Sequence, residues 1–372
     1  MKLIYIANVR IPTEKAHGLQ IMKMCEAFAG ANNEVELVIS RRINHIKKDP
    51  FEYYGVRKNF KITKLPCLDL IILDKYIGHL GMWLESISFN LFVFPYTFFK
   101  KADIIFTRDK FFLPLSFFRK NLVFEVHALP RNYFIYERFI KRCKKIITIT
   151  QGLKNSLIEK GVYKNNILVA PDGVDLEKFN VSLNKEECRK KLNLPTDKKI
   201  VLYAGHLYKW KGVDILAEAS KFLPENYIVY FVGGTEEDIR RFKSAYLTFG
   251  NIKIIGHRPY PEIPYWLKAA DVLVLPNSGK EKISQEWTSP IKLFEYMASG
   301  TPIIASNLPS IREIINNKNA FLVSPDDPRN LADVIKRAIS DKEMATFLSK
   351  NSFNDINRYT WVKRAANILK FI

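Results

Sequence analysis

Cysteine is scarce in this sequence, and its few copies are scattered. The 372 residues include four cysteines, at positions 25, 67, 143 and 188. They stand too far apart for a CxxC redox pair or a zinc knuckle. No signal peptide opens the chain, because Met1-Lys2 leads straight into the strand-like run 3–6 without a cleavage motif. We therefore expect a cytoplasmic protein with reduced thiols and no metal site.

Long hydrophobic runs are also missing. The most apolar stretch, 84–99, is interrupted by a glutamate, two serines, an asparagine and Pro95. A helix that crosses a membrane needs about 20 predominantly apolar residues. This stretch therefore favours a buried helix or one that lies in a membrane interface.

Acidic residues are few relative to basic ones. The chain carries 58 lysines and arginines against 38 aspartates and glutamates, which gives a net charge of +20. Such an excess favours anionic partners: nucleic acid, anionic lipid or phosphorylated ligands. Hydrophobic residues make up 47% and charged residues 26%, which is typical of a folded chain and excludes a disordered protein or a coiled coil.

Several nucleotide and hydrolase motifs are absent. The first glycine of the chain is Gly18, so the first β-α loop, 8–18, holds no GxGxxG. This counts against a dehydrogenase-type dinucleotide site there. The sequence likewise contains no P-loop, no HExxH and no GxSxG.

What the sequence does contain is a repeated alternation of short apolar runs with amphipathic stretches. Runs that are apolar on both faces suit a parallel sheet covered on both sides, so we predict two doubly wound α/β domains. Helices are expected at 17–30, 151–160, from Thr235 onward, and at about 360–372. Strands are predicted at 2–8, 34–40, 60–65, 103–107, 122–126, 145–149, 167–170, 199–204, 226–232, 251–255, 271–275, 302–305 and 319–323.

The break between the domains is expected within 171–195, where turn and loop residues gather. We assign 1–175 to the first domain and 176–355 to the second. The last segment, 356–372, is predicted to form a helix that crosses back to the first domain.

The segment 287–306 carries the strongest functional signal. Ser289 is a good N-cap and Pro290 suits the first helical position, so we predict a helix that ends at Ser299, before Gly300. The N-terminus of a helix that follows a strand and a polar loop offers amides to an anion, with Lys292 in its first turn. Glu295, about 1.5 turns in, is placed to accept hydrogen bonds from vicinal hydroxyls. The alternative is a well-capped surface helix with a solvated glutamate.

Two further segments follow predicted strands. The loop 205–212 places His206, Lys209 and Lys211 between glycines, and these residues suit a diphosphate. The alternative is a basic surface loop. His127 leaves the strand 122–126 at its carboxyl end, on the same side as Glu125, and could donate to a phosphate or a sugar hydroxyl. The alternative is a structural histidine.

Taken together, five segments resemble the retaining glycosyltransferases of family 4, which have the GT-B fold. That fold has two Rossmann-like doubly wound α/β domains that face each other across a cleft, with a C-terminal helix that returns to the first. The segments, in family order, are 16–28, 148–161, 171–179 (the "NGVD…F" segment), 205–212 ("GRLxxxKG") and 289–302 ("SPxKxxEYMAxGxP").

The resemblance implies roles for individual residues. It gives catalytic roles to His127, Lys211 and Glu295, with Glu295 on the ribose hydroxyls and Lys211 on the diphosphate. It implies acceptor contacts from His17 and Arg108. It implies donor contacts from Gly18, Gly205, His206, Lys209, Lys211, Arg258, Glu286, Ser289, Pro290, Ile291 and Glu295.

The sequence departs from the family pattern at two positions. Trp287 stands where the first glutamate of the EX7E pattern is expected, although Glu286 is adjacent. His206 stands where the family has arginine, and Lys209 offers a replacement charge. Because of these two departures, the resemblance does not indicate which sugar the donor carries.

The resemblance implies transfer of a sugar from a nucleotide-diphosphate sugar, most simply a UDP- or GDP-sugar, to an acceptor hydroxyl with retention of configuration. No cofactor is required, and a stimulatory role for Mg²⁺ stays open. We expect a lipid-linked or saccharide acceptor, as in the synthesis of surface polysaccharide, lipid-linked oligosaccharide or glycolipid. The basic, aromatic stretch 98–145 suits peripheral contact with an anionic membrane on its inner face. The alternative is that its aromatic residues belong to the core and its lysines only keep the protein soluble.

Other functions stay open at this point. A nucleotide-sugar 2-epimerase of the same fold would need no acceptor. Trp287 and His206 also allow a non-catalytic glycosyltransferase-like protein. A nucleic-acid-binding protein would fit the charge, but no known nucleic-acid motif appears, so we expect no nucleic-acid partner.

Overall fold

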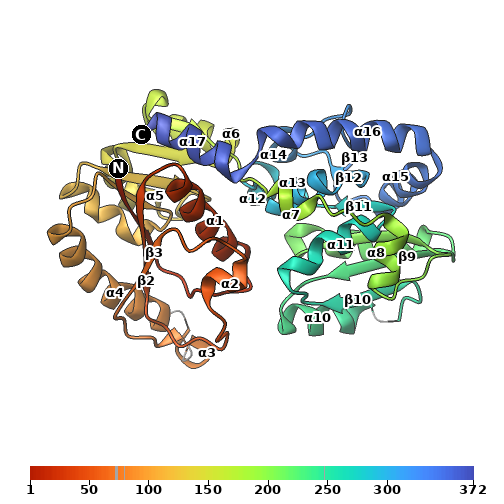
Figure 1. Cartoon of the computed structure of the whole chain (residues 1–372), viewed down its shortest axis with the longest axis horizontal. Helices are drawn as coiled ribbons and strands as arrows, with labels where there is room; N and C mark the ends of the chain where they lie inside the picture. Colours follow the sequence, from red (N-terminus) through yellow and green to blue (C-terminus); the bar gives the residue numbers. More distant parts are fainter. Residues whose placement is uncertain (72–73, 79, 247) are drawn as a thin grey trace. The chain divides into compact units, whose positions relative to one another are not determined.

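The structure is a computed structural model that describes residues 1–71, 74–78, 80–246 and 248–372. The chain divides into two compact units, which are shown in Figure 1. Unit 1 comprises Met1–Pro171 together with Trp361–Ile372, and unit 2 comprises Asp172–Thr360.

Unit 1 is built on a parallel sheet of seven strands in the order β3-β2-β1-β4-β5-β6-β7. The central strands are buried on both faces, as their continuous apolar sequences require. The strands are β1 (Lys2–Ala7), β2 (Glu34–Ser40), β3 (Lys61–Leu65), β4 (Ile104–Thr107), β5 (Leu122–Val126), β6 (Lys145–Thr148) and β7 (Ile167–Val169).

Helices connect these strands, as parallel pairing demands. The C-terminal helix α17, blue in Figure 1, packs against α1 near the other end of the sequence. The main helices are α1 (Ala16–Gly30), α4 (Leu80–Phe99), α5 (Tyr133–Arg142), α6 (Gln151–Glu159) and α17 (Trp361–Phe371), with the shorter α2 (Pro50–Tyr54), α3 (Asp74–Ile77) and the 3₁₀ segment η2 (Lys110–Phe117).

Unit 2 repeats the plan with a parallel sheet in the order β10-β9-β8-β11-β12-β13. Its strands are β8 (Lys199–Ala204), β9 (Tyr227–Val232), β10 (Ile252–Gly256), β11 (Val272–Leu275), β12 (Ile303–Ser306) and β13 (Phe321–Val323). Its helices are α7 (Leu176–Phe179), α8 (Lys185–Lys191), α9 (Val213–Ala219), α10 (Glu236–Tyr246), α11 (Ile263–Ala269), α12 (Lys282–Gln285), α13 (Ile291–Ser299), α14 (Pro309–Arg312), α15 (Pro328–Ser340) and α16 (Lys342–Asp355).

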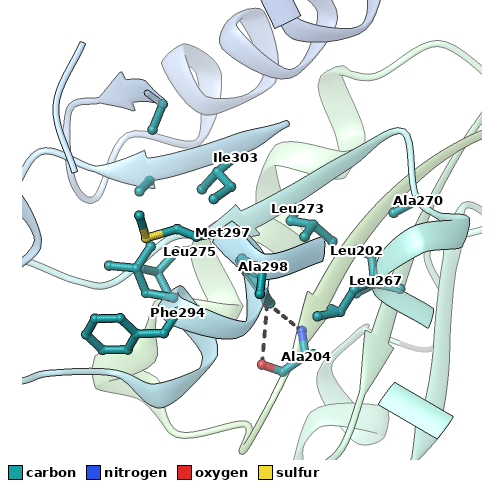
Figure 2. Packing of buried hydrophobic residues seen from close by; sticks show 14 of the residues in the cluster. Leu202, Ala204, Leu267, Ala270, Leu273, Leu275, Phe294, Met297, Ala298 and Ile303 are labelled. Atoms are coloured by element: carbon teal, nitrogen blue, oxygen red, sulfur yellow. Dashed lines mark hydrogen bonds between the residues drawn. The ribbon is translucent and has the colours of Figure 1, made fainter. Parts of the chain in front are cut away.

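Helix α13 is anchored in the core of unit 2. Phe294, Met297 and Ala298 lie against apolar residues of the neighbouring strands and helices, as Figure 2 shows. The backbone N–H of Ala204 at the end of β8 donates to the Tyr296 hydroxyl at 2.8 Å. The core therefore fixes the start of α13 relative to the end of β8. Predicted site residues lie at the start of α13 and just after the end of β8.

The predicted fold class is confirmed: two doubly wound parallel α/β units, with every predicted strand present to within two residues of its predicted ends. The boundary between the units lies at Pro171 and Thr360, whereas the sequence placed the breaks after 175 and 355. The reason is a local pairing: the Val174 N–H donates to the Tyr359 carbonyl at 3.0 Å, and Val174 forms a bridge with Thr360. Residues 172–175 and 356–360 therefore both belong to unit 2.

Candidate functional site

The strand order of each sheet reverses at one place, and ligands of doubly wound folds bind at the carboxyl ends of strands beside such a switch point. In unit 2 the switch lies between β8 and β11, and in unit 1 it lies between β1 and β4. The residues that follow these strands are therefore the ones that can form a site. Each unit is described on its own.

In unit 2, the loop after β8 packs tightly on the loop after β11. Gly205 adopts a φ of +136° and Gly212 a φ of +70°, both unfavourable for residues with a side chain. A Cβ on Gly212 would lie 1.7 Å from the carbonyl oxygen of Pro276. The second glycine of the basic loop is therefore required for the contact between the two loops.

This contact predicts the effect of Gly212→Ala. The added methyl group meets backbone on a left-handed residue, so we expect a loss of about 3 kcal/mol in the free energy of unfolding, measured by urea denaturation. Gly250→Ala is the matched control, because a Cβ there meets nothing within 4 Å. If both substitutions had an equally small effect on the free energy of unfolding, the contact between the two loops would not require a glycine at position 212.

Helix α13 begins one residue later than predicted. Pro290 is the N-cap, and no side chain caps the helix there. The Ser289 hydroxyl, expected to be the cap, instead accepts the backbone N–H of Asp172 at 2.9 Å. The prediction of Ser289 as N-cap is therefore wrong. Ile291 is the first helical residue.

Lys292 in the first turn of α13 is the least expected feature of the site. Only 8% of its surface is exposed, and its Nζ lies 3.7 Å from the centroid of the Tyr203 ring. In the part of the chain that the structure describes, no group forms a hydrogen bond with this nitrogen. Burial and the nearby charge of Lys211 hold the pKa of Lys292 well below its usual range, although Glu295 opposes the shift.

Lys292 lies beside Gly205 at the end of β8. A Cβ built on Gly205 would lie 3.6 Å from both Cδ and Nζ of Lys292. Lys211 belongs to the same neighbourhood, and burial lowers its pKa to about 8. The pKa values of two lysines near the carboxyl end of β8 are thus lowered. An anionic ligand there would favour their protonated, charged forms.

Glu295 lies one turn further along α13 and is buried. The Tyr260 hydroxyl donates to its Oε1 at 3.0 Å. Burial raises the pKa of Glu295 to about 7, while the Tyr260 hydrogen bond and the charge of Lys292 act in the opposite direction. Sequence reasoning named Glu295 but missed Tyr260, which follows β10, and left Lys292 out of the donor contacts.

The other predicted donor residues of unit 2 are less enclosed. His206 stacks on Tyr208, and its Nδ1 lies 3.6 Å from Oδ2 of Asp238. Lys209 and Arg258 are exposed. Glu286 ends α12, with its Oε2 3.6 Å from the ammonium of Lys282.

Unit 1 holds a second polar cluster, centred on one carboxylate. Glu125 is fully buried. Its Oε1 accepts a hydrogen bond from Nε2 of Gln20 at 2.5 Å and lies 2.5 Å from Nε2 of His127. Nη2 of Arg364 lies 3.3 Å from the same oxygen, and Arg108 donates to the side-chain oxygen of Gln20. Burial alone would raise the pKa of Glu125, but Arg364 and His127 hold it well below its usual range. His127 and Arg108 are thus brought into one network, as their positions after β5 and β4 suggest.

Gly18 lies within α1 and not in a loop. A Cβ there would lie 2.2 Å from the Tyr54 hydroxyl and 2.6 Å from a methyl carbon of Thr13. Tight packing by itself thus accounts for this glycine. His17, beside it, is half-buried.

Comparisons with solved structures agree with the fold. HepE of Anabaena, crystallised with UDP and glucose, superposes with a TM-score of 0.78 at 16% identity, over 100% of this chain and 98% of that one. A sucrose-phosphate synthase of Thermosynechococcus elongatus gives 0.79 at 19% identity, over 99% and 97%. The chain has the GT-B fold.

The family match lies within the second unit of this GT-B chain. Residues 184–355 match the family described as glycosyl transferases group 1. An Escherichia coli UDP-Gal:alpha-D-GlcNAc-diphosphoundecaprenol alpha-1,3-galactosyltransferase is 30% identical over 245 residues, 62% of this chain. A D-inositol 3-phosphate glycosyltransferase of Xylanimonas cellulosilytica is 27% identical over 221 residues, 56% of this chain. The matched regions span 61% and 51% of these two relatives.

Proposed function

We propose that this protein is a hexosyltransferase that moves a sugar from a nucleoside-diphosphate sugar to an acceptor hydroxyl. The observation that carries the proposal is the pair Lys211 and Lys292 beside Glu295, at the switch point of unit 2. The family match over 184–355 and the UDP bound by a structural neighbour support it.

In the proposed mechanism the donor binds at the start of α13. The ionised carboxylate of Glu295 accepts hydrogen bonds from the two ribose hydroxyls, and the ammonium groups of Lys211 and Lys292 bind the diphosphate. As the bond between sugar and phosphate breaks, negative charge grows on the leaving diphosphate, and these fixed cations stabilise it.

On the acceptor side we propose His127 and Arg108 in unit 1. Glu125 keeps the ring of His127 oriented through the 2.5 Å contact to Nε2. We propose retention of configuration, as in family 4, with the leaving phosphate as the group that takes the acceptor proton. A lipid-diphosphate acceptor is proposed because the Escherichia coli relative is described as acting on diphosphoundecaprenol.

The first test is a thermal-shift series on the full chain with UDP, GDP, ADP, CMP and dTDP, with and without Mg²⁺. A ligand at 100 times its dissociation constant stabilises by about 2.7 kcal/mol, which is a shift of several degrees. We expect one nucleotide to give a selective shift. No shift with any of them would overturn the proposed function.

Glu295→Gln then tests the nucleoside contact. The amide keeps the size of the carboxylate but loses its charge, so we expect nucleotide affinity to fall about 10-fold or more. Titration calorimetry with the nucleotide found in the thermal-shift series measures the effect. Glu343→Gln is the control, because Glu343 is an exposed glutamate of α16 that has no part in the proposed site. Equal affinities of the Glu295→Gln variant and the unmodified protein would remove Glu295 from the site.

A further inference from the structure

Helix α4 of unit 1 has its polar and apolar faces reversed. Glu85, its single charged residue, is fully buried and pairs with Arg42 at 2.8 Å. Ser86, Ser88 and Thr97 are also buried on the inner side. A helix on the surface of a water-soluble protein normally turns such residues outward.

The outer side of α4 is apolar instead. Leu91 is 70% exposed, Phe98 66% and Phe99 82%. Further exposed residues of the same helix are Leu80, Met82, Trp83, Leu84, Ile87 and Phe92. Contiguous apolar surface of this kind marks a site that binds another apolar surface.

The apolar surface continues beyond α4. Phe117 and Phe118 at the end of η2 are exposed, and the Phe118 ring packs against Phe94 with centroids 6.4 Å apart. Phe134 and Ile135 at the start of α5, which packs on η2, are exposed as well. In contrast Phe112, part of the aromatic stretch singled out in the sequence, belongs to the core.

A groove of about 360 Å³ lies between α4 and η2. Its walls are almost wholly apolar and include Phe94, Phe98, Leu115 and Phe118, while Arg119 stands at its edge. A second groove, of about 480 Å³, is lined by Leu65, Phe92 and Phe99 together with Lys100, whose ammonium is paired with Glu36. The mainly apolar walls of both grooves suit a lipid chain.

Basic residues border this surface. Lys101 follows α4, and Arg119 and Lys120 follow η2, whereas the ammonium of Lys100 is paired with Glu36. Lys101 and Lys120 are exposed. The last turn of α5 adds Lys141 and Arg142, and the Arg142 guanidinium lies 4.6 Å from the centroid of the Phe117 ring. The border is thus positive, in keeping with the net charge of +20.

We propose that the outer face of α4, with the ends of η2 and α5, is a docking surface for an anionic membrane. Its aromatic side chains enter the interfacial layer, and its lysines and arginines bind the lipid phosphates. A two-fold dimer through this face would set two positive borders against each other, so the charge favours lipid over a second copy. Across the described residues, no helix is both long enough and apolar enough to span a bilayer.

This proposal rests on the proposed function in one respect: a lipid-linked acceptor has to be reached at a membrane. The test therefore measures membrane binding and nucleotide binding separately. The full chain is sedimented with vesicles of phosphatidylcholine alone, and with vesicles that contain about 30% phosphatidylglycerol. We expect about tenfold or stronger binding to the anionic vesicles, and a clear loss as NaCl rises from about 0.1 M to about 0.5 M.

Two variants locate the surface. Leu91→Gln with Phe98→Gln removes apolar contacts, and Lys101→Glu with Lys120→Glu reverses two border charges. We expect each pair to weaken binding to anionic vesicles about tenfold or more. Met344→Gln with Phe347→Gln, on exposed positions of α16 in unit 2, is the matched control and should bind like the unmodified protein.

Trp83, 47% exposed on α4, supplies a direct readout. Brominated lipids should quench its fluorescence, and Trp83→Phe should remove the quenched component. Normal vesicle binding by both α4 and border variants would overturn the proposal, as would no binding by the unmodified protein. The unmodified protein could instead form a dimer and not bind vesicles. If the double variant Leu91→Gln with Phe98→Gln dissociates that dimer, the face binds a second copy of the chain. Failure of vesicle binding with an intact nucleotide shift would leave the proposed transferase activity standing.

Discussion

Replacing Lys292 by methionine is expected to weaken nucleoside-diphosphate binding about 10-fold to 100-fold and, at the same time, to leave the protein as stable or more stable. The first effect follows because a hydrogen bond to a charged group contributes about 1.5–3 kcal/mol. The second follows because the ammonium is buried, with no hydrogen-bond partner for its Nζ in the described part of the chain. An apolar side chain of similar length removes that desolvation cost.

The two effects together separate a binding role from a structural one. A lysine that held the fold together would lower the free energy of unfolding when replaced, whereas a lysine held ready for a ligand lowers only affinity. Titration calorimetry with the nucleotide found in the thermal-shift series and urea denaturation of the same preparation give both numbers. Lys350→Met, on an exposed position of α16, is the control for loss of one positive charge.

Loss of stability with unchanged nucleotide affinity would show that Lys292 is structural, with its contact to Tyr203 as the stabilising interaction. Unchanged affinity and unchanged stability would remove it from the site altogether. The double variant Lys211→Met with Lys292→Met adds a further check. If both ammonium groups bind the same diphosphate, their effects should not be additive, since residues that share one partner are coupled.

The sequence predicted the two sheets well because the relevant signals are local. Strands such as β4 and β8 are continuous apolar runs bounded by polar residues, and a parallel sheet buried on both faces needs nothing else. The helix stop at Gly300 was equally local: this glycine adopts a φ of +67° and ends α13. The site signal was also local in part, because the loop 205–212 and α13 each follow a strand that meets the switch point.

The errors concern contacts between residues that are distant in the sequence. Ser289 has the right type for an N-cap, but the Asp172 N–H takes its hydroxyl, and no local pattern shows that partner. Tyr54 packs where a Cβ of Gly18 would be, so close packing alone requires this glycine, and its implied donor contact stays a prediction. Tyr260 could not be linked to Glu295 from the sequence, because the two residues are 35 positions apart and come together only in the folded unit. Lys292 was visible as a first-turn lysine, but its burial was not.

The same limit applies to the reversed helix α4. Its composition predicted a buried or interfacial helix. One face is buried, and the interfacial role of the exposed face stays a proposal. Glu85 lies on the buried face, where the guanidinium of Arg42, in the loop between β2 and α2, donates to its carboxylate at 2.9 Å. A buried ion pair of this kind is costly to desolvate, so the polar network around Glu85 favours one orientation of the helix over the apolar alternative.

Arg364 carries the second large expected effect. It belongs to the C-terminal helix α17, and 4% of its surface is exposed. Its Nη2 lies 3.3 Å from Oε1 of Glu125, and its Nε donates to the carbonyl of Pro171 at 2.8 Å. Arg364→Met would leave the Glu125 carboxylate buried without its nearest fixed cation. We therefore expect a loss of about 3–5 kcal/mol in the free energy of unfolding near pH 7.

The pH dependence of this loss tests its cause. Glu125 has a folded pKa below its unfolded value, so its ionised form contributes stability that is present above the unfolded pKa and is lost as pH falls toward the folded one. Without Arg364 the folded pKa rises, and this contribution shrinks. The difference between the Arg364→Met variant and the unmodified protein should therefore be larger at pH 7 than at pH 4, measured by urea denaturation at both values.

Lys363→Met, one residue earlier on the exposed side of α17, is the matched control and should change stability by about 0.5 kcal/mol or less. A loss for Arg364→Met that is equal at both pH values would assign the effect to packing and the Pro171 hydrogen bond alone. If the pH dependence holds, the last helix of the chain fixes the charge of Glu125. Since the Glu125 oxygen that Arg364 approaches also contacts Nε2 of His127, α17 would then set the orientation of the proposed acceptor-side histidine.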